Sequence, residues 1–588
     1  MIRLLLFICA AFIPTTRAAD DRISWQAWSE QLFAQAKREN RFVLLDLEAV
    51  WCHWCHVMDE KTYHDPQVVK LVGERYLPVR VDQDAQPDIS IRYEDYGWPA
   101  TIVFAPDGSE IVKRRGYIAP AAMASMLSAI IEDPSPGPSV SAQAEITPAA
   151  DAHLSPQQRV QIEKVYRDAY DKEFGGWGRV QKFIHAASME YALAHATKAE
   201  YQDKARQTLD AALNLIDPVW GGVYQYSDRR DWKSPHFEKI MSFQADYLRL
   251  YTQAYARWEE PRYLKAARDI DRYLEGFLTA PSGAFYTSQD ADLNKTIDGH
   301  VYYANPDSQR RALGLPRIDQ HLYARENGWS IRALAELYEV TGDPAVLNRA
   351  QRAAAWIVGN RALPGGGFRH DETNRAGPYL GDTLAMAEAF LALYTATGER
   401  GWLTRARDAV AFIANTFKDA AGFSTALAPA TAAGVFAKPV KQIDENIALA
   451  RLTNLLNRYT GDASYRTLAD HALRYLTVPA ITDQPRLLAG LLLADQEFND
   501  APAHLTVVGP KRDAAAQALF AAATRYSAPY RRIEWWDKGE GPLPNPDVQY
   551  PSFKRAAAFV CVNNSCSSPI FQPTQIAEIA NRLLSRAN

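Results

Sequence analysis

Two cysteines separated by two residues carry the clearest chemistry in the sequence. The run Trp51-Cys52-His53-Trp54-Cys55-His56 follows an apolar segment at 42–47, which predicts a buried strand, and opens a predicted helix. Unpaired N–H groups and the positive end of the helix dipole stabilise a thiolate there and lower its pKa. The two-residue spacing lets the second thiol attack a mixed disulfide formed by the first. The pattern predicts a redox pair with Cys52 as the nucleophile and Cys55 as the resolving cysteine.

Two other interpretations of this pair stay open. One is a purely structural disulfide between Cys52 and Cys55, and the other is zinc binding by the two thiolates and a nearby histidine. The second ligand pair that a zinc finger needs has no counterpart nearby, so neither a metal nor a cofactor is expected.

The surrounding elements predict an α/β domain over residues 22–132. Strands are expected at 42–47, 77–81, 101–104 and 111–115, with helices at 57–72 and 120–131. Asp107-Gly108 is a hairpin turn signal between the last two strands.

This part of the chain resembles thioredoxins in three separated features. Besides the cysteines, Asp46 stands six residues before Cys52, and Gly97-Trp98-Pro99-Ala100-Thr101 matches the thioredoxin cis-proline loop. The resemblance implies that Asp46 helps to deprotonate Cys55. It also implies that Pro99 packs against the disulfide and holds extended substrate backbone.

The remaining chain predicts a linker followed by a large helical domain. Residues 133–155 are rich in proline, serine and alanine, and residues 156–498 are helical throughout. Similar helix openings recur near residues 201, 263, 346, 402 and 465, several after Thr-Gly-Asp-like turns at 341–343, 397–399 and 460–462. Each step holds two helices, which favours an (α/α)6 toroid of six hairpins, with an open superhelix as the alternative.

Polar side chains gather before the probable inner helices, at what would be one mouth of this toroid. The candidate pocket residues are Lys182, His185, His236, Glu238, Asp290, Asp292, Glu326, Asp382 and Glu445, with Lys239, Arg325, Asn327, Asp444 and Asn446 beside them. Carboxylates, histidines and nearby aromatic loops suit a carbohydrate-like ligand, with an acid–base carboxylate pair or a proton-moving histidine pair. Acidic residues at helix starts are equally typical of helix caps, so that interpretation stays open.

The C-terminal residues 499–588 predict a small α/β region. Strands are expected at 504–508, 532–535 and 557–562, with a terminal helix from Thr574. Cys561 and Cys566 form a second close pair. A structural disulfide is the first interpretation, and a redox relay for Cys52 and Cys55 is the alternative.

Composition and the first residues bear on location and partners. Sixty-five basic and 69 acidic residues give a net charge of −4, which predicts no nucleic-acid partner. The short apolar run at 4–13 with small residues to Ala18 predicts a signal peptide at 1–18 and export, in bacteria to the periplasm. An uncleaved anchor is the alternative. No later run reaches 18 apolar residues, so no stable membrane span is expected after cleavage.

The order of motifs along the whole chain is similar to the spermatogenesis-associated thioredoxin-domain proteins and their bacterial relatives. The matching segments are Cys52 to Met58, Val81 to Ile89, Gly97 to Pro99, Gly175 to Phe183, Pro235 to Met241, Phe285 to Asp292 and Val560 to Cys566. The resemblance implies a thioredoxin-like domain joined to a six-hairpin toroid similar to sugar epimerases and glycosidases. This sequence departs from the family pattern at Glu326-Asn327-Gly328, Ser242-Phe243 and 443–446, all at the expected mouth.

Three functions follow as hypotheses. The first is an exported thiol-disulfide oxidoreductase that acts on protein thiols or disulfides, with a toroid that binds a partner or a carbohydrate-like small molecule. The second is an epimerase-like or glycosidase-like enzyme in which the thioredoxin-like domain is ancillary. The third is a non-catalytic binder of a glycan or a protein.

Overall fold

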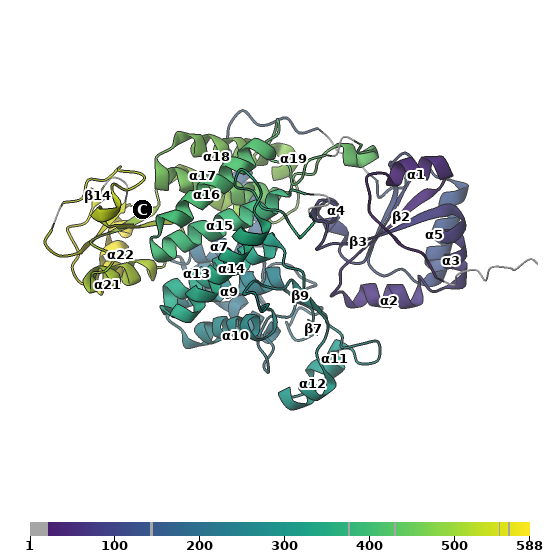
Figure 1. Cartoon of the computed structure of the whole chain (residues 1–588), viewed down its shortest axis with the longest axis horizontal. Helices are drawn as coiled ribbons and strands as arrows, with labels where there is room; N and C mark the ends of the chain where they lie inside the picture. The colour runs from purple at the N-terminus through teal and green to yellow at the C-terminus, as the bar shows by residue number, and fades with distance from the viewer. Residues whose placement is uncertain are drawn as a thin grey trace, which may run out of the picture. The chain divides into compact units, whose positions relative to one another are not determined.

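The computed structural model describes residues 22–140, 145–373, 377–428, 431–551, 553–562 and 565–587. The predicted signal peptide lies outside these residues. Two compact units are present (Figure 1). In the described range, the first contains residues 22–47, 54–80 and 96–140, and the second contains 48–53, 81–95 and the chain after 140. Two short segments flanking the thioredoxin-like strands therefore belong to the helical unit.

The first unit is built on a five-stranded sheet of order β1-β3-β2-β4-β5. The strands are β1 (Gln26–Ala27), β2 (Phe42–Glu48), β3 (Tyr76–Asp82), β4 (Ala100–Phe104) and β5 (Glu110–Arg115). β1 runs parallel to β3, while β4 is antiparallel to both β2 and β5. Helices α1 (Leu32–Glu39), α2 (His53–Lys61), α3 (Pro66–Arg75) and α5 (Pro120–Glu132) complete the unit. This is the α/β fold that the sequence predicts.

The predicted single helix at 57–72 is wrong in one respect, because the structure divides it into α2 and α3. Pro66 has no backbone N–H and occupies the first turn of α3, where that loss costs least. The Asp65 side chain caps this new N-terminus by accepting hydrogen bonds from the N–H groups of Gln67 and Val68.

The predicted linker is partly anchored to its neighbours. The Gly137 N–H donates to the Ile111 carbonyl at 2.8 Å, and the Lys113 N–H donates to Ser139 Oγ at 2.9 Å, which holds this stretch on β5. Leu154 is buried in the core of the helical unit, and its N–H donates to Asp495. Both ends of the segment are thus fixed by backbone hydrogen bonds.

The second unit is dominated by two concentric layers of helices. The inner helices are α7 (Ala186–Ala194), α9 (Met241–Trp258), α13 (Ala324–Thr341), α15 (Leu380–Thr397), α17 (Ile443–Thr460) and α20 (Ala489–Asn499). The outer helices are α6 (Pro156–Asp168), α8 (Ala199–Ala212), α10 (Pro261–Phe277), α14 (Pro344–Arg361), α16 (Arg400–Thr416) and α18 (Ala463–Leu476). Each inner helix packs on the next, and α20 returns to pack on α7. The ring is therefore a closed (α/α)6 toroid rather than an open superhelix.

The Thr-Gly-Asp-like turns are the hairpin connections between the two layers. Gly342, Gly398 and Gly461 end α13, α15 and α17 in the left-handed conformation, which glycine adopts without steric cost. Asp343 and Asp462 then cap the next outer helix through their side chains. The repeated sequence signal thus ends an inner helix and begins an outer one within three residues.

The C-terminal region carries a four-stranded sheet of order β12-β11-β13-β14. Its strands are β11 (Ala503–Val508), β12 (Arg531–Trp536), β13 (Ala557–Val562) and β14 (Ser565–Cys566), with helices α21 (Ala514–Thr524) and α22 (Gln575–Ala587). The sequence predicts all but the short β14. Among the described residues, no helix is both long and apolar enough to cross a membrane.

Candidate functional site

The cysteine pair lies where the sequence predicts it, between the end of β2 and the start of α2. Cys52 directly precedes α2, and its N–H donates to the Ala49 carbonyl at 3.1 Å. Cys52 and Cys55 are both disulfide-bonded, and each is 4% exposed. This arrangement sets a cysteine sulfur at a helix N-terminus, where a thiolate is stabilised after reduction.

Asp46 is a buried carboxylate on β2, 2% exposed. Its Oδ2 accepts from Arg80 Nε at 2.9 Å, and its Oδ1 accepts from the Tyr63 hydroxyl at 3.2 Å. Burial raises the pKa of Asp46, while Arg80 opposes that shift. A buried carboxyl with a raised pKa can accept and return a proton more readily than an ordinary carboxylate. The Arg80 ion pair is a feature that the sequence analysis did not identify.

Pro99 follows a cis peptide bond with Trp98. It immediately precedes β4, whose Ala100 pairs with Leu47 of β2. The cis-proline loop therefore adjoins the end of the strand that leads to the cysteines. The Pro99 carbonyl accepts from the Gly116 N–H at 2.8 Å.

Trp51 and His53, which flank Cys52, form hydrogen bonds with polar groups elsewhere in the second unit. Trp51 Nε1 donates to Asp84 Oδ2 at 2.8 Å, and His53 Nδ1 lies 2.6 Å from Asp292 Oδ2. The His53 N–H, at the start of α2, donates to Glu238 Oε1 at 3.4 Å. The hydrogen bond to Asp292 raises the pKa of His53.

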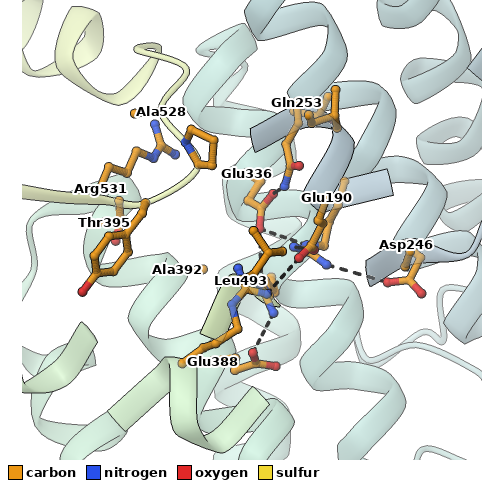
Figure 2. Close-up of a pocket in the computed structure, with 18 of the residues that line it drawn as sticks. Glu190, Asp246, Gln253, Glu336, Glu388, Ala392, Thr395, Leu493, Ala528 and Arg531 are labelled. Atoms are coloured by element: carbon orange, nitrogen blue, oxygen red, sulfur yellow. Dashed lines mark hydrogen bonds and ion pairs between the residues drawn. The ribbon is translucent and has the colours of Figure 1, made fainter. Parts of the chain in front are cut away.

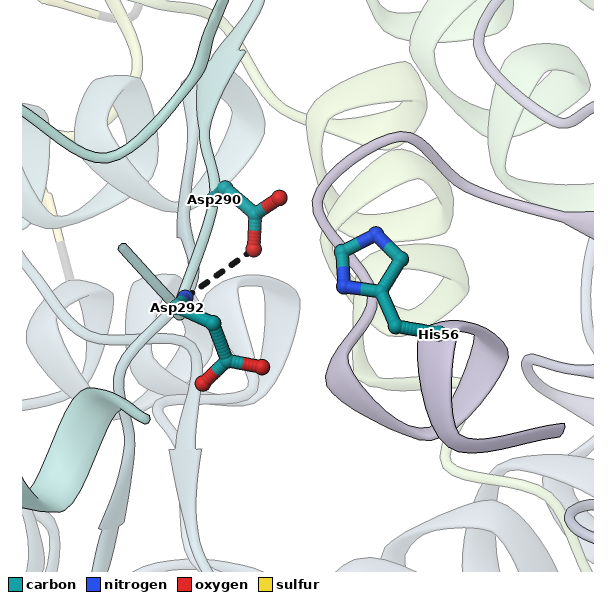
Figure 3. A group of neighbouring side chains, drawn as sticks. All are labelled: His56, Asp290 and Asp292. Carbon is teal, nitrogen blue, oxygen red and sulfur yellow. Dashed lines mark hydrogen bonds between the residues drawn. The ribbon is translucent and has the colours of Figure 1, made fainter. Parts of the chain in front are cut away.

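Sheet register brings Glu238 and the Asp290 loop together. β8 (Lys239–Ile240) pairs antiparallel with β9 (Ser288–Gln289), with Lys239 opposite Gln289. Continuing this register sets Glu238 opposite Asp290. Asp290 Oδ1 accepts from the Asp292 N–H at 3.0 Å, so the two aspartates form a tight turn (Figure 3). Asp292 Oδ1 in turn accepts from the Gly299 N–H at 2.9 Å.

His236 lies beside Glu238 but has a partner of its own. Its Nε2 is 2.6 Å from Asp228, and its Nδ1 is 3.8 Å from Glu238 Oε2. Glu238 is 3% exposed, and Oε2 accepts no hydrogen bond from the described residues. Burial lowers the pKa of His236, but Glu238 and Asp228 outweigh it and raise that pKa overall.

The three candidate carboxylates at the first turns of inner helices already accept hydrogen bonds. Glu326 accepts from Arg325 at 2.7 Å, and Glu445 accepts from the Thr425 hydroxyl at 2.7 Å. Asp382 accepts from the Arg325 N–H at 2.9 Å and lies 2.8 Å from His370 Nδ1. Burial raises the pKa of Glu445 to about 7.

His370 connects the segment 81–95 to these carboxylates. Its Nε2 lies 2.7 Å from the Asp84 carbonyl oxygen, and its Nδ1 faces Asp382. Both partners only accept hydrogen bonds, so both ring nitrogens donate and the imidazole is charged. Burial, and next the charge of Glu326, raise the pKa of Asp84 to about 7. The sequence analysis missed His370, which follows the glycine-rich loop at 365–367.

Lys182 and Lys239 stabilise the glycine-rich loops through ion pairs and hydrogen bonds. Both are fully buried, and they pair with Asp171 at 2.9 Å and Asp217 at 2.8 Å. Lys182 also donates to two loop carbonyls, and Lys239 donates to one. These contacts occupy their ammonium groups, so Lys182 serves the fold of the mouth. His185 caps α7 by accepting from the Ser188 N–H at 3.3 Å.

The second cysteine pair is a disulfide, Cys561–Cys566, across the paired strands β13 and β14. The C-terminal region meets the C-terminal ends of inner helices, because Arg531 pairs with Glu339 and the Ile533 N–H donates to the Tyr459 hydroxyl. Residues 48–53 instead meet Glu238, just before α9 begins. An inner helix of 18 residues is about 27 Å long. This separation favours the structural interpretation of Cys561–Cys566.

Comparisons with known proteins agree with the first unit and with the whole-chain resemblance. Residues 12–132 match the family model Thioredox_DsbH, described as a protein of unknown function, DUF255. Spermatogenesis-associated protein 20 of Homo sapiens is 26% identical over 307 residues, which is 46% of this chain and 39% of that protein. Thiol:disulfide interchange protein DsbD 2 of Pseudomonas aeruginosa is 35% identical over 96 residues, 16% of each chain.

A crystal structure of D-mannose isomerase overlays with a TM-score of 0.46 at 13% identity, covering 58% of this chain and 96% of that one. The match to the first curated relatives spans less than half of their length. The chain is therefore similar to the Thioredox_DsbH family model over residues 12–132 and to spermatogenesis-associated protein 20 over about half of its length.

Proposed function

We propose that the protein is a thiol-disulfide oxidoreductase that acts on protein thiols or disulfides. The observation that carries the proposal is the Cys52–Cys55 disulfide at the N-terminus of α2, with buried Asp46 on the adjoining strand. The similarity of this segment to an interchange protein supports the same chemistry. Export to an oxidising compartment, as the first residues predict, is part of the proposal.

The reaction transfers two electrons between the cysteine pair and a client. The Cys52 thiolate attacks a client disulfide, a Cys52–client bond forms, and one client thiolate leaves and takes up a proton. Asp46 accepts the proton of Cys55, directly or through water. The Cys55 thiolate then attacks Cys52 Sγ, which forms Cys52–Cys55 and releases the second client thiolate. The reverse sequence oxidises a client dithiol.

We assign positioning roles to Glu238 and Asp292. Glu238 accepts a hydrogen bond from the N–H that begins α2, and Asp292 fixes the imidazole of His53. A carboxylate at this helix terminus competes with the Cys52 thiolate for the same positive potential. Because Cys52 is only 4% exposed, attack on a protein client requires residues 48–53 to open from these carboxylates. Small thiols should therefore react faster than protein clients.

An enzyme that acts on sugars at the toroid mouth is the weaker candidate. Glu326 and Asp382, which an acid–base mechanism would use, are held by Arg325 and His370. These partners occupy Glu326 Oε1 and Asp382 Oδ1, while Oε2 and Oδ2 of the two carboxylates accept no hydrogen bond from the described residues.

The test of the proposed function is trapping of a mixed disulfide. Cys55→Ser should accumulate a covalent complex with a disulfide-containing client such as insulin, because the resolving thiol is absent. Cys52→Ser should give neither complex nor turnover and is the matched control. Equal activity of Cys52→Ser and the wild type, with no complex in Cys55→Ser, would overturn the proposal.

A further inference from the structure

The toroid encloses a second feature that the redox chemistry does not use, a central cavity of about 550 Å³ (Figure 2). All six inner helices line it. Its size lies within the range of small-molecule sites, which is roughly 300–1,000 Å³. Of the candidate pocket residues predicted from the sequence, His185 lines this cavity, whereas Glu326, Asp382 and Glu445 do not belong to its lining.

A continuous series of ion pairs runs around the cavity wall. We call these seven residues the charged belt: Glu388, Arg332, Glu336, Arg249, Glu190, Arg451 and Glu497. In that order the successive distances are 2.7, 3.3, 3.0, 2.7, 2.9 and 2.8 Å. Every inner helix contributes at least one member. The belt thus presents alternating acceptors and donors to the cavity interior (Figure 2).

Such a belt is a poor way to stabilise a helical ring. Replacing buried ion pairs with apolar side chains is often neutral or stabilising, because desolvation of the charges offsets their attraction. Apolar neighbours such as Leu391 and Leu493 already line the same wall. A polar interior that costs folding free energy is better explained by a polar ligand.

The belt holds four glutamates and three arginines, and each arginine pairs with two of the glutamates. Although burial opposes it, the charge of Arg249 and its fellow arginines holds the pKa of Glu190 well below its ordinary value. Similarly, Arg249 and Arg332 lower the pKa of Glu336 to about 2 against the effect of burial. Both carboxylates are ionised at neutral pH. Because every member is already paired, a ligand with a net charge would have to compete with an existing ion pair in a partly buried setting.

Two further features complete the site. Thr252, on α9, lines the cavity, is 1% exposed, and its Oγ1 has no hydrogen-bond partner among the described residues. The segment 524–531 closes the end nearest the C-terminal region, where the Tyr530 hydroxyl accepts from Asn454 Nδ2 at 2.9 Å. A buried polar atom such as Thr252 Oγ1 ordinarily has a hydrogen-bond partner.

We propose that the central cavity binds a neutral polyhydroxylated small molecule of monosaccharide to disaccharide size. Each hydroxyl can donate to a belt carboxylate and accept from a belt guanidinium without changing the net charge. The C–H faces of such a ligand match the apolar wall at Leu391, Ala392 and Leu493. The cavity reaches the mouth at His185 and Asp444, and the proposal does not depend on the redox chemistry.

The test uses the full oxidised chain and calorimetric titration at millimolar concentrations. The neutral probes are glucose, myo-inositol and trehalose, with glucosamine and glucuronate as charged counterparts. We expect at least one neutral probe to bind, and its charged counterparts to bind about tenfold more weakly. Preferential binding of a charged probe, or no binding by any neutral probe, would overturn the proposal.

Variants locate the binding without touching the belt. Ala392→Leu on α15 and Ala256→Leu on α9 fill the cavity, and Ala411→Leu on the exposed face of α16 is the matched control. Each cavity variant that keeps the thermal unfolding transition of the wild type should bind the neutral probe at least tenfold more weakly, about 1.4 kcal/mol. The control should leave it unchanged. Unchanged affinity in both cavity variants would place binding elsewhere and contradict the proposal.

Discussion

The two disulfides of this chain differ in what surrounds them. Cys52–Cys55 adjoins a helix N-terminus, with a buried carboxyl on the neighbouring strand and, between the two cysteines, a histidine whose pKa is raised by its hydrogen bond to Asp292. Cys561–Cys566 joins two hydrogen-bonded strands of a sheet. Burial differs as well, because Cys52 and Cys55 are each 4% exposed, whereas Cys561 is buried and Cys566 is exposed.

The comparison teaches that neighbours, rather than exposure, assign the chemistry, because the more exposed pair is the one without a helix terminus or a carboxyl beside it. A helix terminus stabilises the reduced thiolate and so makes a disulfide easier to reduce. Strand pairing holds Cys561 and Cys566 together whether or not they are bonded, which favours the oxidised form. The first pair is arranged for exchange and the second for stability.

The largest effect should come from Asp46→Asn. Loss of the proton acceptor should slow release of a client from the Cys52 mixed disulfide by about 100-fold, the lower range for general base catalysis. In the wild type the release rate should rise with pH as Asp46 ionises, at a pKa raised above 3.8 by burial. That limb of the pH profile should vanish in the variant. Quenched-flow measurement of the mixed disulfide follows the step.

Tyr63→Phe is the control for this experiment. It removes the 3.2 Å hydrogen bond to Asp46 and keeps the carboxyl. A small rate change is expected, together with a retained pH limb. Identical rates in the wild type and Asp46→Asn would show that the carboxyl takes no part in resolution.

Removing the C-terminal disulfide should affect stability and leave exchange intact. The double change Cys561→Ser and Cys566→Ser should lower the free energy of unfolding of the C-terminal region by about 2 kcal/mol, from the entropy of a short closed loop. Urea unfolding followed by tryptophan fluorescence measures the loss. Insulin reduction by this variant should match the wild type. A loss of turnover in the folded variant would favour the relay interpretation instead.

Glu238→Gln tests how the charge at the N-terminus of α2 affects the Cys52–Cys55 disulfide. It removes a negative charge next to the N–H that begins α2, so the Cys52 thiolate should gain stability. We expect the reduction potential of Cys52–Cys55 to rise by roughly 30 mV, tenfold in the equilibrium constant. The potential of Cys561–Cys566 should stay constant in the same sample. A fall in the first potential would contradict the assigned role.

The smallest expected effect concerns Asp292→Asn. The carboxylate raises the pKa of His53 in the folded state, so its stabilising contribution is present below the unfolded pKa and is lost as pH rises through the folded value. The stability difference between wild type and variant should therefore be larger at pH 6 than at pH 9. Histidine NMR titration should show a lower His53 pKa in the variant. Asp228 lies beside His236, and Asp228→Asn should leave the pKa of His53 unchanged.

Much of the fold follows from local sequence signals. Pro66 with Asp65, and Gly342 with Asp343, each specify an element boundary through backbone chemistry. The sequence analysis used the second signal and overlooked the first. The placement of Asp46 and of the cis-proline loop on the paired strands β2 and β4 follows from strand pairing and a recognisable loop.

The partners of the candidate residues could not be predicted in this way. Lys182 and Glu326 bind partners that are close in sequence, whereas Asp382 also accepts from the Arg325 N–H, which belongs to another hairpin. The charged belt is also assembled from separate helices, since of its six ion pairs only Arg332–Glu336 lies within one helix. Whether a mouth carboxylate caps, pairs or faces a ligand is decided by these long-range contacts.

The most direct test of the account is the reduction potential of both disulfides in one purified sample, by thiol trapping in graded redox buffers and peptide mass spectrometry. The account predicts that Cys52–Cys55 titrates at about −120 to −270 mV, the range of oxidoreductases, and that Cys561–Cys566 resists reduction to below about −300 mV. A Cys52–Cys55 potential below that of the C-terminal pair would contradict it, since the first disulfide would then be the structural one.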